Sequence, residues 1–505
     1  MKGDICMLQF YNTSMMNIVE NYRNLVTMAM TDPQTDSLEE RETHTKYMHE
    51  CCRGNASARS YIIEKIEEIL RENVSDEERE RLKEIIENEL NTYNNKLYER
   101  VDLSNVGDNR PVKISFYQLL EACGSDEQNI EIEQINSGLL DEISILAREL
   151  YKKVYGVDIL DELWRMRLNN IEIHDMDKIR VELPTGVWYT ISDCNFTDSE
   201  EVVEVAKKLL SQGTATSDLT YEECKRQTNL LDGSRITVAL KPCSATNIIA
   251  IKKFSNFIVT KENMIANGTI TEEMIKDIEC LAKGRANTVI AGGINTGKTT
   301  FGMMYVDLLP PNIKIGMLDP TKDFDIQKMY PNRDIIILYE TEKYNLNNQF
   351  NTLFTLGRDV LGISEAKSYE VEQMIKGMLR GNNGSFCTLH SANTKDVVMN
   401  IAYMCQEGET TQDIRTLTSR ISSALDIIIR MRHFKDGRRI VDEISEVVAT
   451  GNLDNPFKIN KMYYWNEKEK KVVRNKEFKL SNDLEESLLY FGCSEDDIAF
   501  LNRRE

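Results

Sequence analysis

The sequence predicts an α/β protein whose carboxyl-terminal half contains a mostly parallel β-sheet covered by helices on both faces. After residue 271, short and wholly apolar runs alternate with helical stretches, as the buried strands of parallel sheets do. The middle of the chain alternates apolar and polar residues with a period of two, and the beginning shows the apolar spacing of amphipathic helices. These patterns divide the chain into a helical extension over residues 1–125, an α+β domain over 126–258 and the parallel-sheet domain over 259–505.

Length and composition narrow the class of protein. The chain has 505 residues, enough for two to four domains. Its 62 Lys and Arg against 82 Asp and Glu give a net charge of −20, which argues against a protein that coats nucleic acid. We find no signal peptide and no apolar run approaching the roughly 18 residues of a membrane-spanning helix. The 11 cysteines have no repeated spacing, so we expect reduced thiols and a cytoplasmic protein.

Helical periodicity is strongest near the beginning of the chain. Residues 57–70 and 75–90 repeat apolar side chains at helical spacing, with charged residues between them. Ser75 followed by Glu78 forms the pattern of a capping box, so a helix should begin there. Two amphipathic helices in a hairpin are the simplest interpretation, with apolar faces that pack in a core or against a partner. A further helical stretch is expected over residues 139–168.

Two groups of strands are predicted, one for each of the later domains. A helix over residues 199–210, beginning at Asp198 or Ser199, belongs to the α+β domain, and another follows Thr271. The predicted strands of the α+β domain cover residues 171–174, 178–183, 187–189, 235–240 and 248–253. Those of the parallel sheet cover residues 288–291, 313–318, 334–338, 360–363 and 386–389.

The most specific motif is a phosphate-binding loop, or P-loop, that directly follows the strand of residues 288–291. It matches G-x-x-x-x-G-K-[ST] and consists of Gly292, Gly293, Ile294, Asn295, Thr296, Gly297, Lys298, Thr299 and Thr300. Glycines let successive backbone N–H groups point at phosphate oxygens, and the helix that begins here adds its positive end. Lys298 would bind the β- and γ-phosphates and Thr299 would coordinate Mg²⁺, so the motif predicts a site for ATP with Mg²⁺.

A P-loop also needs acidic groups at the ends of neighbouring parallel strands. One predicted strand runs into Asp319 and another into Glu365, which is placed to orient or deprotonate water. Either acid alone would more often be a solvated residue at a strand end. His390 follows the last predicted strand and can donate to a phosphate oxygen, although by itself it is also compatible with a turn histidine.

Taken in order, these motifs resemble the hexameric ATPases of type II and type IV secretion systems, type IV pili and conjugation machines, and most of all the tight-adherence pilus subfamily. The resemblance extends from about Leu160 to the end of the sequence. The matching segments are residues 231–236 (LDGSRI), 251–254 (IKKF), the P-loop, Asp319 in the aspartate box, Glu365 in the Walker B position, and residues 388–393 (TLHSAN), 436–439 (DGRR) and 444–447 (ISEV).

The resemblance implies a fold and a set of roles. Residues 259–505 would form a RecA-like P-loop ATPase motor domain, joined by a short linker to the α+β amino-terminal domain, with nucleotide bound between them. Glu365 would be the catalytic carboxylate, His390 would sense the γ-phosphate and Arg235 would be a candidate arginine finger. The implied protein is a homo-oligomer, a hexamer, that is cytoplasmic and peripheral to the inner membrane, where it acts on a platform protein without direct contact to nucleic acid.

Some positions depart from the family pattern and leave two functions open. Leu318 precedes Asp319 where the family has glutamate, and Lys252 and Lys367 stand where it has arginines. Lysine does not reproduce the bidentate contact of arginine. The first hypothesis is therefore an ATP-hydrolysing motor for pilus assembly, protein secretion or conjugative transfer, and the alternative is a nucleotide-binding assembly scaffold with weak or no turnover. A nucleic-acid motor such as a helicase is disfavoured by the acidic charge.

Overall fold

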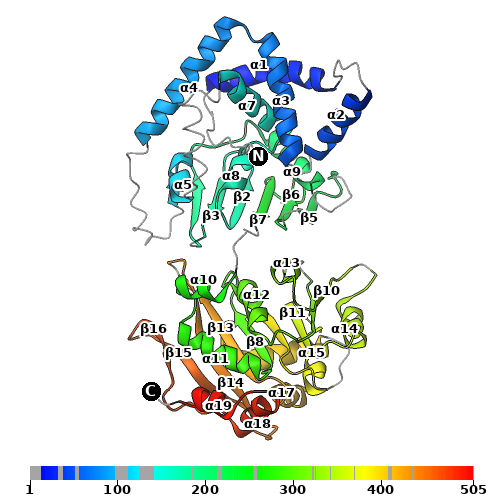
Figure 1. Ribbon diagram of the computed structural model, residues 1–505, viewed down its shortest axis with the longest axis vertical. Coiled ribbons are helices and arrows are strands. Elements are labelled where there is room, and N and C mark those ends of the chain that lie inside the picture. Colours follow the sequence, from blue (N-terminus) through cyan, green and yellow to red (C-terminus); the bar gives the residue numbers. More distant parts are fainter. Residues whose placement is uncertain are drawn as a thin grey trace. The chain divides into compact units, whose positions relative to one another are not determined.

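The computed structural model divides into two compact units, Met1–Ser255 and Asn256–Glu505 (Figure 1). It describes residues 13–31, 38–51, 56–96, 112–123, 141–184, 186–212, 219–230, 233–253, 259–320, 324, 326–341, 343–368, 370–407, 412–434 and 436–503. Residues 231, 232 and 254 of the matched segments lie outside this set. Within the first unit, the predicted division into residues 1–125 and 126–258 stays a prediction.

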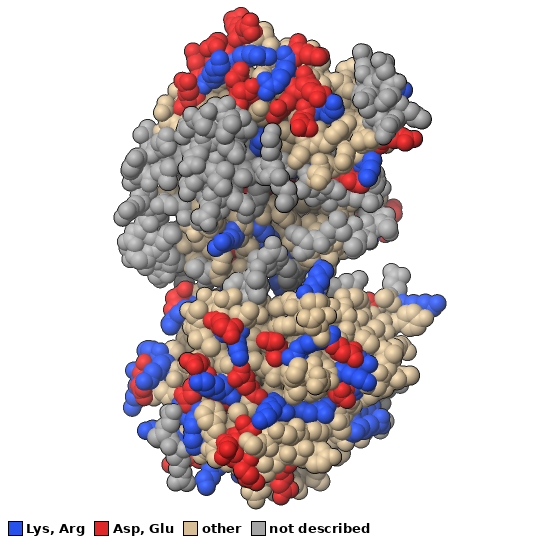
Figure 2. All heavy atoms as spheres, in the orientation of Figure 1, with Lys and Arg blue, Asp and Glu red and all other residues tan. Residues whose placement is uncertain are grey.

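Helices open the described part of the first unit. They are α1 (Thr13–Thr31), α2 (Leu38–Cys51), α3 (Ala56–Asn73) and α4 (Asp76–Lys96). The predicted capping box is confirmed, since Ser75 N donates to Glu78 and Glu78 N donates to Ser75 Oγ, each at 3.3 Å. Ile62, Ile66 and Leu70 on α3 are fully buried, so the apolar face of this helix contributes to a core. Figure 2 shows acidic side chains gathered over the helices of this unit.

A seven-stranded sheet completes the first unit, in the order β1-β4-β3-β2-β7-β6-β5. Its strands are β1 (Val112–Ile114), β2 (Asn170–His174), β3 (Ile179–Glu182), β4 (Trp188–Ile191), β5 (Lys225–Asn229), β6 (Arg235–Ala239) and β7 (Ile248–Lys252). The accompanying helices are α5 (Phe116–Cys123), α7 (Glu142–Val154), α8 (Ile159–Arg165) and α9 (Ser199–Ser211). The five strands predicted for this region are present, and Asp198 caps α9. Residues 139–168 were expected to be one helical stretch, but α7 ends and α8 begins on either side of Gly156. A side chain at Gly156 would not fit, because its Cβ would lie 2.9 Å from Lys152 Cα.

One expectation about the cysteines is wrong. Cys224 and Cys243 form a disulfide, with their Cα atoms 5.8 Å apart. The β5–β6 hairpin explains the proximity, because Leu240 N donates to Cys224 O and so places Cys243 only three residues beyond the paired position. The two cysteines are 19 residues apart in the sequence, and only the pairing of β5 with β6 brings them together, so their spacing alone does not predict the disulfide.

The second unit is built on a nine-stranded sheet in the order β10-β9-β11-β12-β8-β13-β14-β15-β16. The strands from β10 to β13 are parallel, and the last three are antiparallel. The strand bounds are β8 (Thr288–Gly292), β9 (Ile315–Leu318), β10 (Ile335–Leu338), β11 (Val360–Ala366), β12 (Phe386–His390), β13 (Ile427–His433), β14 (Arg439–Ala449), β15 (Phe457–Asn466) and β16 (Lys471–Arg474).

Helices cover both faces of this sheet, as predicted (Figure 1). Successive strand residues point to opposite faces, so Val289 and Ile290 enter two separate apolar cores. The helices are α10 (Lys261–Ala266), α11 (Glu272–Lys283), α12 (Lys298–Leu308), α13 (Ile326–Met329), α14 (Leu346–Thr355), α15 (Glu370–Leu379), α16 (Val397–Gln406), α17 (Ile414–Ser422), α18 (Asn482–Tyr490) and α19 (Glu495–Leu501). None of the helices in the described ranges is long and apolar enough to cross a membrane.

Candidate functional site

The P-loop connects the buried strand β8 to the first turn of α12. Asn295 and Gly297 have positive φ angles of 57° and 90°, which reverse the chain between the two elements. Gly292 must be glycine, because a Cβ there would lie 2.6 Å from the carbonyl oxygen of Met431. Ile294 is 79% exposed at the tip of the loop, whereas Thr296 is buried. The loop therefore has the tight, backbone-lined form that phosphate binding requires.

Side chains from the loop and from other strands stabilise this conformation. Thr296 Oγ1 donates to Gly293 O at 3.0 Å, and Lys298 Nζ donates to the same oxygen at 2.7 Å. Arg439 Nε donates to Asn295 O at 2.8 Å from the start of β14. Thr299, predicted to coordinate Mg²⁺, and Thr300, predicted as part of the nucleotide-binding loop, lie half-buried in the first turn of α12.

Three of the predicted functional side chains are in contact at the carboxyl edge of the parallel sheet. Lys298 Nζ lies 3.3 Å from His390 Nδ1, and His390 Nε2 lies 2.9 Å from Glu365 Oε1. An ammonium group only donates hydrogen bonds, so Nδ1 accepts and the ring proton belongs on Nε2, from which it is donated to Glu365. The order β11-β12-β8 brings these residues together, because each one lies at or near the end of its strand.

Glu365 was expected just beyond a strand ending at Ile363. Instead, β11 continues to Ala366 with a register shift between Ile363 and Ala366, and Glu365 lies within this irregular segment. Its second oxygen, Oε2, lies 2.9 Å from Lys367 Nζ. Burial raises the pKa of Glu365, but hydrogen bonds and charge from Lys367 and then His390 outweigh it, so the pKa lies below its ordinary value. The carboxylate is thus ionised and fixed in orientation.

Asp319 follows β9 and is almost completely buried. Its Oδ1 accepts a hydrogen bond from Ser364 Oγ at 2.5 Å, and its Oδ2 accepts one from Phe324 N at 2.8 Å. Thr388 Oγ1 in turn donates to Ser364 O at 2.6 Å. The contacts join the ends of β9, β11 and β12, so Asp319 is connected to the segment of Glu365 through the neighbouring residue Ser364.

Arg235, the candidate arginine finger, lies in the first unit. It is the first residue of β6, is half-buried and pairs in register with Asn229 on β5 and Lys252 on β7. Its part in nucleotide chemistry stays a prediction. Sequence reasoning noted Lys367 only as a departure from the family pattern, and it gave Arg439 no role in the site. The DGRR segment was visible, but nothing in it indicates a contact with a loop 144 residues earlier.

The fold and the loop define a P-loop nucleotide-binding protein. No family model matches the chain. It is 21% identical over 228 residues to the "Probable conjugal transfer protein TrbB" of Sinorhizobium fredii, which covers 44% of this chain and 68% of the relative. It is 18% identical over 217 residues to the "Conjugal transfer protein TrbB" of Rhizobium radiobacter, covering 42% of this chain and 65% of that relative. These relatives and the ordered motifs support the resemblance of the chain to the type II/type IV secretion traffic ATPase family.

A solved structure shares a remote likeness. The ATPase DotB of Legionella pneumophila is 13% identical, with a TM-score of 0.40 over 68% of this chain and 84% of that one.

Proposed function

We propose that this chain is an ATP-hydrolysing motor that works at the inner membrane, as a homo-oligomer of six copies, on a platform protein of a pilus, secretion or conjugation machine. The observation that supports it most directly is the contact chain from Lys298 through His390 to Glu365. It connects the group that binds phosphate to the carboxylate that acts on water. The similarity to two conjugal transfer proteins supports the same class of machine.

The residues of the loop fit a nucleotide with its metal ion. Lys298 and the backbone N–H groups of the loop would bind the β- and γ-phosphates, and the Thr299 hydroxyl would be the protein ligand for Mg²⁺. Bound Mg²⁺ neutralises charge that develops on the phosphate oxygens. Asp319 is a buried carboxylate at the end of β9, one strand from Glu365, and it would support the metal site from there.

His390 couples binding to the catalytic carboxylate. A γ-phosphate competes with His390 Nδ1 for the ammonium of Lys298, so arrival of ATP changes the hydrogen bonding of the ring that holds Glu365. Glu365 then orients the attacking water or accepts its proton. Arg235, on β6, is kept in this proposal as the candidate arginine finger.

The test is phosphate release from Mg-ATP by the purified full-length chain, with its mass in solution measured in the same preparation. We expect turnover above that of a Lys298→Ala variant, in a preparation whose mass is a multiple of the monomer. No release above the Lys298→Ala control, with the membrane partner present, would contradict a motor.

A specific observation favours the alternative, a nucleotide-binding assembly scaffold. Both oxygens of Glu365 are engaged, one by His390 and one by Lys367, and its lowered pKa makes it a weaker base. In that case Mg-ATP binds and promotes assembly without turnover. Measured hydrolysis that a Glu365→Gln substitution abolishes would exclude the scaffold.

A further inference from the structure

The P-loop has two flanks, and the functional groups described above occupy only one of them. On the β12 flank, Ser391 N donates to Gly292 O at 3.3 Å and His390 contacts Lys298. On the opposite flank lies β13, whose Met431 pairs in register with Gly292. The hairpin from β13 into β14 returns to this flank, because His433 pairs with Arg439.

Arg439 contacts both residues that give the loop its reversal. Its Nε donates to the carbonyl oxygen of Asn295 at 2.8 Å. A Cβ placed on Gly297 would lie 3.6 Å from Arg439 Cδ, so the stem of the arginine packs beside that glycine. Asn295 and Gly297 are the two residues of the loop with positive φ. Asparagine enters the left-handed region more readily than most residues but less readily than glycine, so a contact that holds Asn295 there favours this form of the loop.

We propose that Arg439 is a positioning residue for nucleotide binding. By donating a hydrogen bond to the carbonyl oxygen of Asn295, it keeps the loop in the form in which its N–H groups converge on phosphate. This inference rests on the proposed nucleotide site and adds a residue to it. The arginine acts through the loop backbone, so its effect is on affinity for the phosphates of a nucleoside diphosphate or triphosphate.

The neighbouring residue supplies a matched control. Arg438 lies on the same turn and carries the same charge, but its guanidinium pairs with Asp436 at 2.8 Å and is largely exposed. An Arg438→Ala variant changes net charge as Arg439→Ala does and removes no contact to the loop. An Arg439→Lys variant keeps a donor that can reach the Asn295 carbonyl, so it tests rescue by a conservative change.

The experiment measures the dissociation constant of Mg-ADP by calorimetry on the full-length chain, for wild type, Arg439→Ala, Arg439→Lys and Arg438→Ala. We expect affinity to fall about tenfold in Arg439→Ala, to stay within about threefold of wild type in Arg439→Lys, and to be unchanged in Arg438→Ala. Because the contact is short-range, the ratio of wild type to Arg439→Ala should be the same at low salt and at 0.5 M NaCl. The unfolding midpoint of nucleotide-free Arg439→Ala should fall no further than the loss of one hydrogen bond allows, so every variant stays folded at the temperature of the measurement.

Several results would overturn the inference. They are equal affinity of Arg439→Ala and wild type, equal loss in Arg438→Ala, no recovery in Arg439→Lys, or a ratio that disappears at high salt. An Arg439→Ala variant that is unfolded at the temperature of the measurement would also overturn it. A wild-type chain that binds Mg-ADP but releases no phosphate from ATP, with the membrane partner present, would contradict the proposed motor and leave this inference standing. A wild-type chain that does not bind Mg-ADP would contradict both.

Discussion

Two carboxylates of the second unit, Glu365 and Asp277, make similar contacts in different surroundings, and we expect different roles for them. Each accepts hydrogen bonds from two nitrogen-bearing side chains. Glu365 lies at the carboxyl edge of the sheet, 23% exposed, with Lys367 two residues away and His390 on the next strand. Asp277 lies on α11, fully buried, and its two guanidinium partners, Arg474 and Arg503, come from the last 32 residues of the chain.

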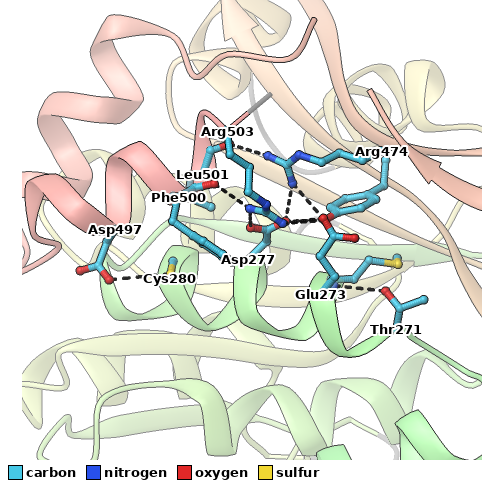
Figure 3. A network of polar contacts seen from close by, with 11 residues as sticks. Thr271, Glu273, Asp277, Cys280, Arg474, Asp497, Phe500, Leu501 and Arg503 are labelled. Carbon is cyan, nitrogen blue, oxygen red and sulfur yellow. Dashed lines mark hydrogen bonds and ion pairs between the residues drawn. The ribbon is translucent and has the colours of Figure 1, made fainter. Parts of the chain in front are cut away.

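The contacts of Asp277 bind the end of the chain to α11 (Figure 3). Arg474 Nη1 and Arg503 Nη1 each donate to it at 2.5 Å, as does the hydroxyl of Tyr463. Arg474 also donates to Leu501 O at 2.6 Å, which fixes the end of α19. We call Asp277, Arg474, Arg503 and Tyr463 the carboxyl-terminal clasp. Asp277 has its charged partners inside the protein, whereas Glu365 is partly exposed to solvent. We therefore expect Asp277 to contribute to stability and Glu365 to contribute to catalysis.

The largest expected effect is that of Glu365→Gln on turnover. Removing the ionised carboxylate should lower phosphate release about 10²- to 10⁴-fold, because glutamine neither accepts a proton nor orients water as a charged group does. Its free energy of unfolding should change by less than about 1 kcal/mol, since the ion pair with Lys367 is half-exposed. Steady-state kinetics and urea unfolding of the same preparation measure the two effects.

Glu372 on α15 is the matched control for this substitution. It pairs with Lys376 and Arg420, and no described contact joins it to the loop. A Glu372→Gln variant should keep wild-type turnover. Normal ATP turnover by Glu365→Gln, together with a large loss in its free energy of unfolding, would show that Glu365 stabilises the fold and does not take part in catalysis.

The second effect is the loss of stability in Asp277→Asn. The buried guanidinium of Arg474 and the partly exposed one of Arg503 would then face a neutral amide, and breaking a buried pair costs about 3–5 kcal/mol. Mg-ADP affinity at low temperature should not change. Trp465 lies on β15 and the other two tryptophans lie in the first unit, so fluorescence in a Trp164→Phe, Trp188→Phe background follows the second unit alone.

Glu273→Gln tests whether the effect belongs to the buried centre of the clasp. Glu273 contacts Arg503 at 2.7 Å but is 38% exposed, so its loss should cost less than about 1 kcal/mol. Equal destabilisation by both variants would show that the clasp is no more than a set of surface ion pairs.

The sequence predicts the site better than the clasp for a physical reason. Strands buried on both faces, such as β8 and β9, are wholly apolar and are recognised directly, and the ends of parallel strands meet at one edge. Glu365 was therefore predicted at the sheet edge that carries the P-loop, whereas the role of His390 was implied by the family resemblance. The polar edge strand β5 was missed, because only Thr228 of its five residues is buried.

Contacts made by late segments escape such reasoning. The helix after Thr271 was predicted, and Thr271 caps it, but Asp277 looks like a solvated charge on an amphipathic helix until Arg474 and Arg503 are placed. Arg439 and Asn295 are likewise joined only by the register of the β13–β14 hairpin. Local periodicity carries no information about partners that a distant strand supplies.

A third carboxylate of the second unit, Asp426, makes the stability of the protein depend on pH. Asp426, just before β13, accepts a hydrogen bond from Asn287 N at 2.8 Å, and desolvation raises its pKa from 3.8 to about 7. The folded state then binds more protons than the unfolded state between these values. Stability should therefore fall as pH rises from about 4 to about 7, with a slope no steeper than about 1.4 kcal/mol per pH unit from this group.

Asp426→Asn removes the titrating group and keeps an acceptor for Asn287. Its unfolding midpoint should exceed that of wild type at pH 8, and the difference should shrink toward pH 4. Urea unfolding followed through Trp465 at several pH values measures it. A wild type whose stability rises over this interval relative to Asp426→Asn would contradict the raised pKa.

The smallest change in stability should come from an exposed ion pair between the end of α11 and the start of α19. Lys283 Nζ lies 2.6 Å from Asp497 Oδ2, with the lysine half-exposed. The hydrogen bond from Lys283, followed by that from the Ser494 backbone, lowers the pKa of Asp497 to about 2. The stabilisation is present above the unfolded pKa of 3.8 and is lost as pH falls toward 2. Lys283→Ala should therefore cost less than about 1 kcal/mol at pH 7 and nothing at pH 2.

Asp497→Ala should cost more than Lys283→Ala, because Asp497 also completes the capping box of α19 with Ser494. Loss of a cap costs about 1 kcal/mol in addition to the ion pair. Urea unfolding through Trp465 at pH 7 ranks the two variants. Lys283→Ala should lower the free energy of unfolding much less than Asp277→Asn does. Equal losses would show that the solvent exposure of an ion pair does not determine how much it stabilises this domain.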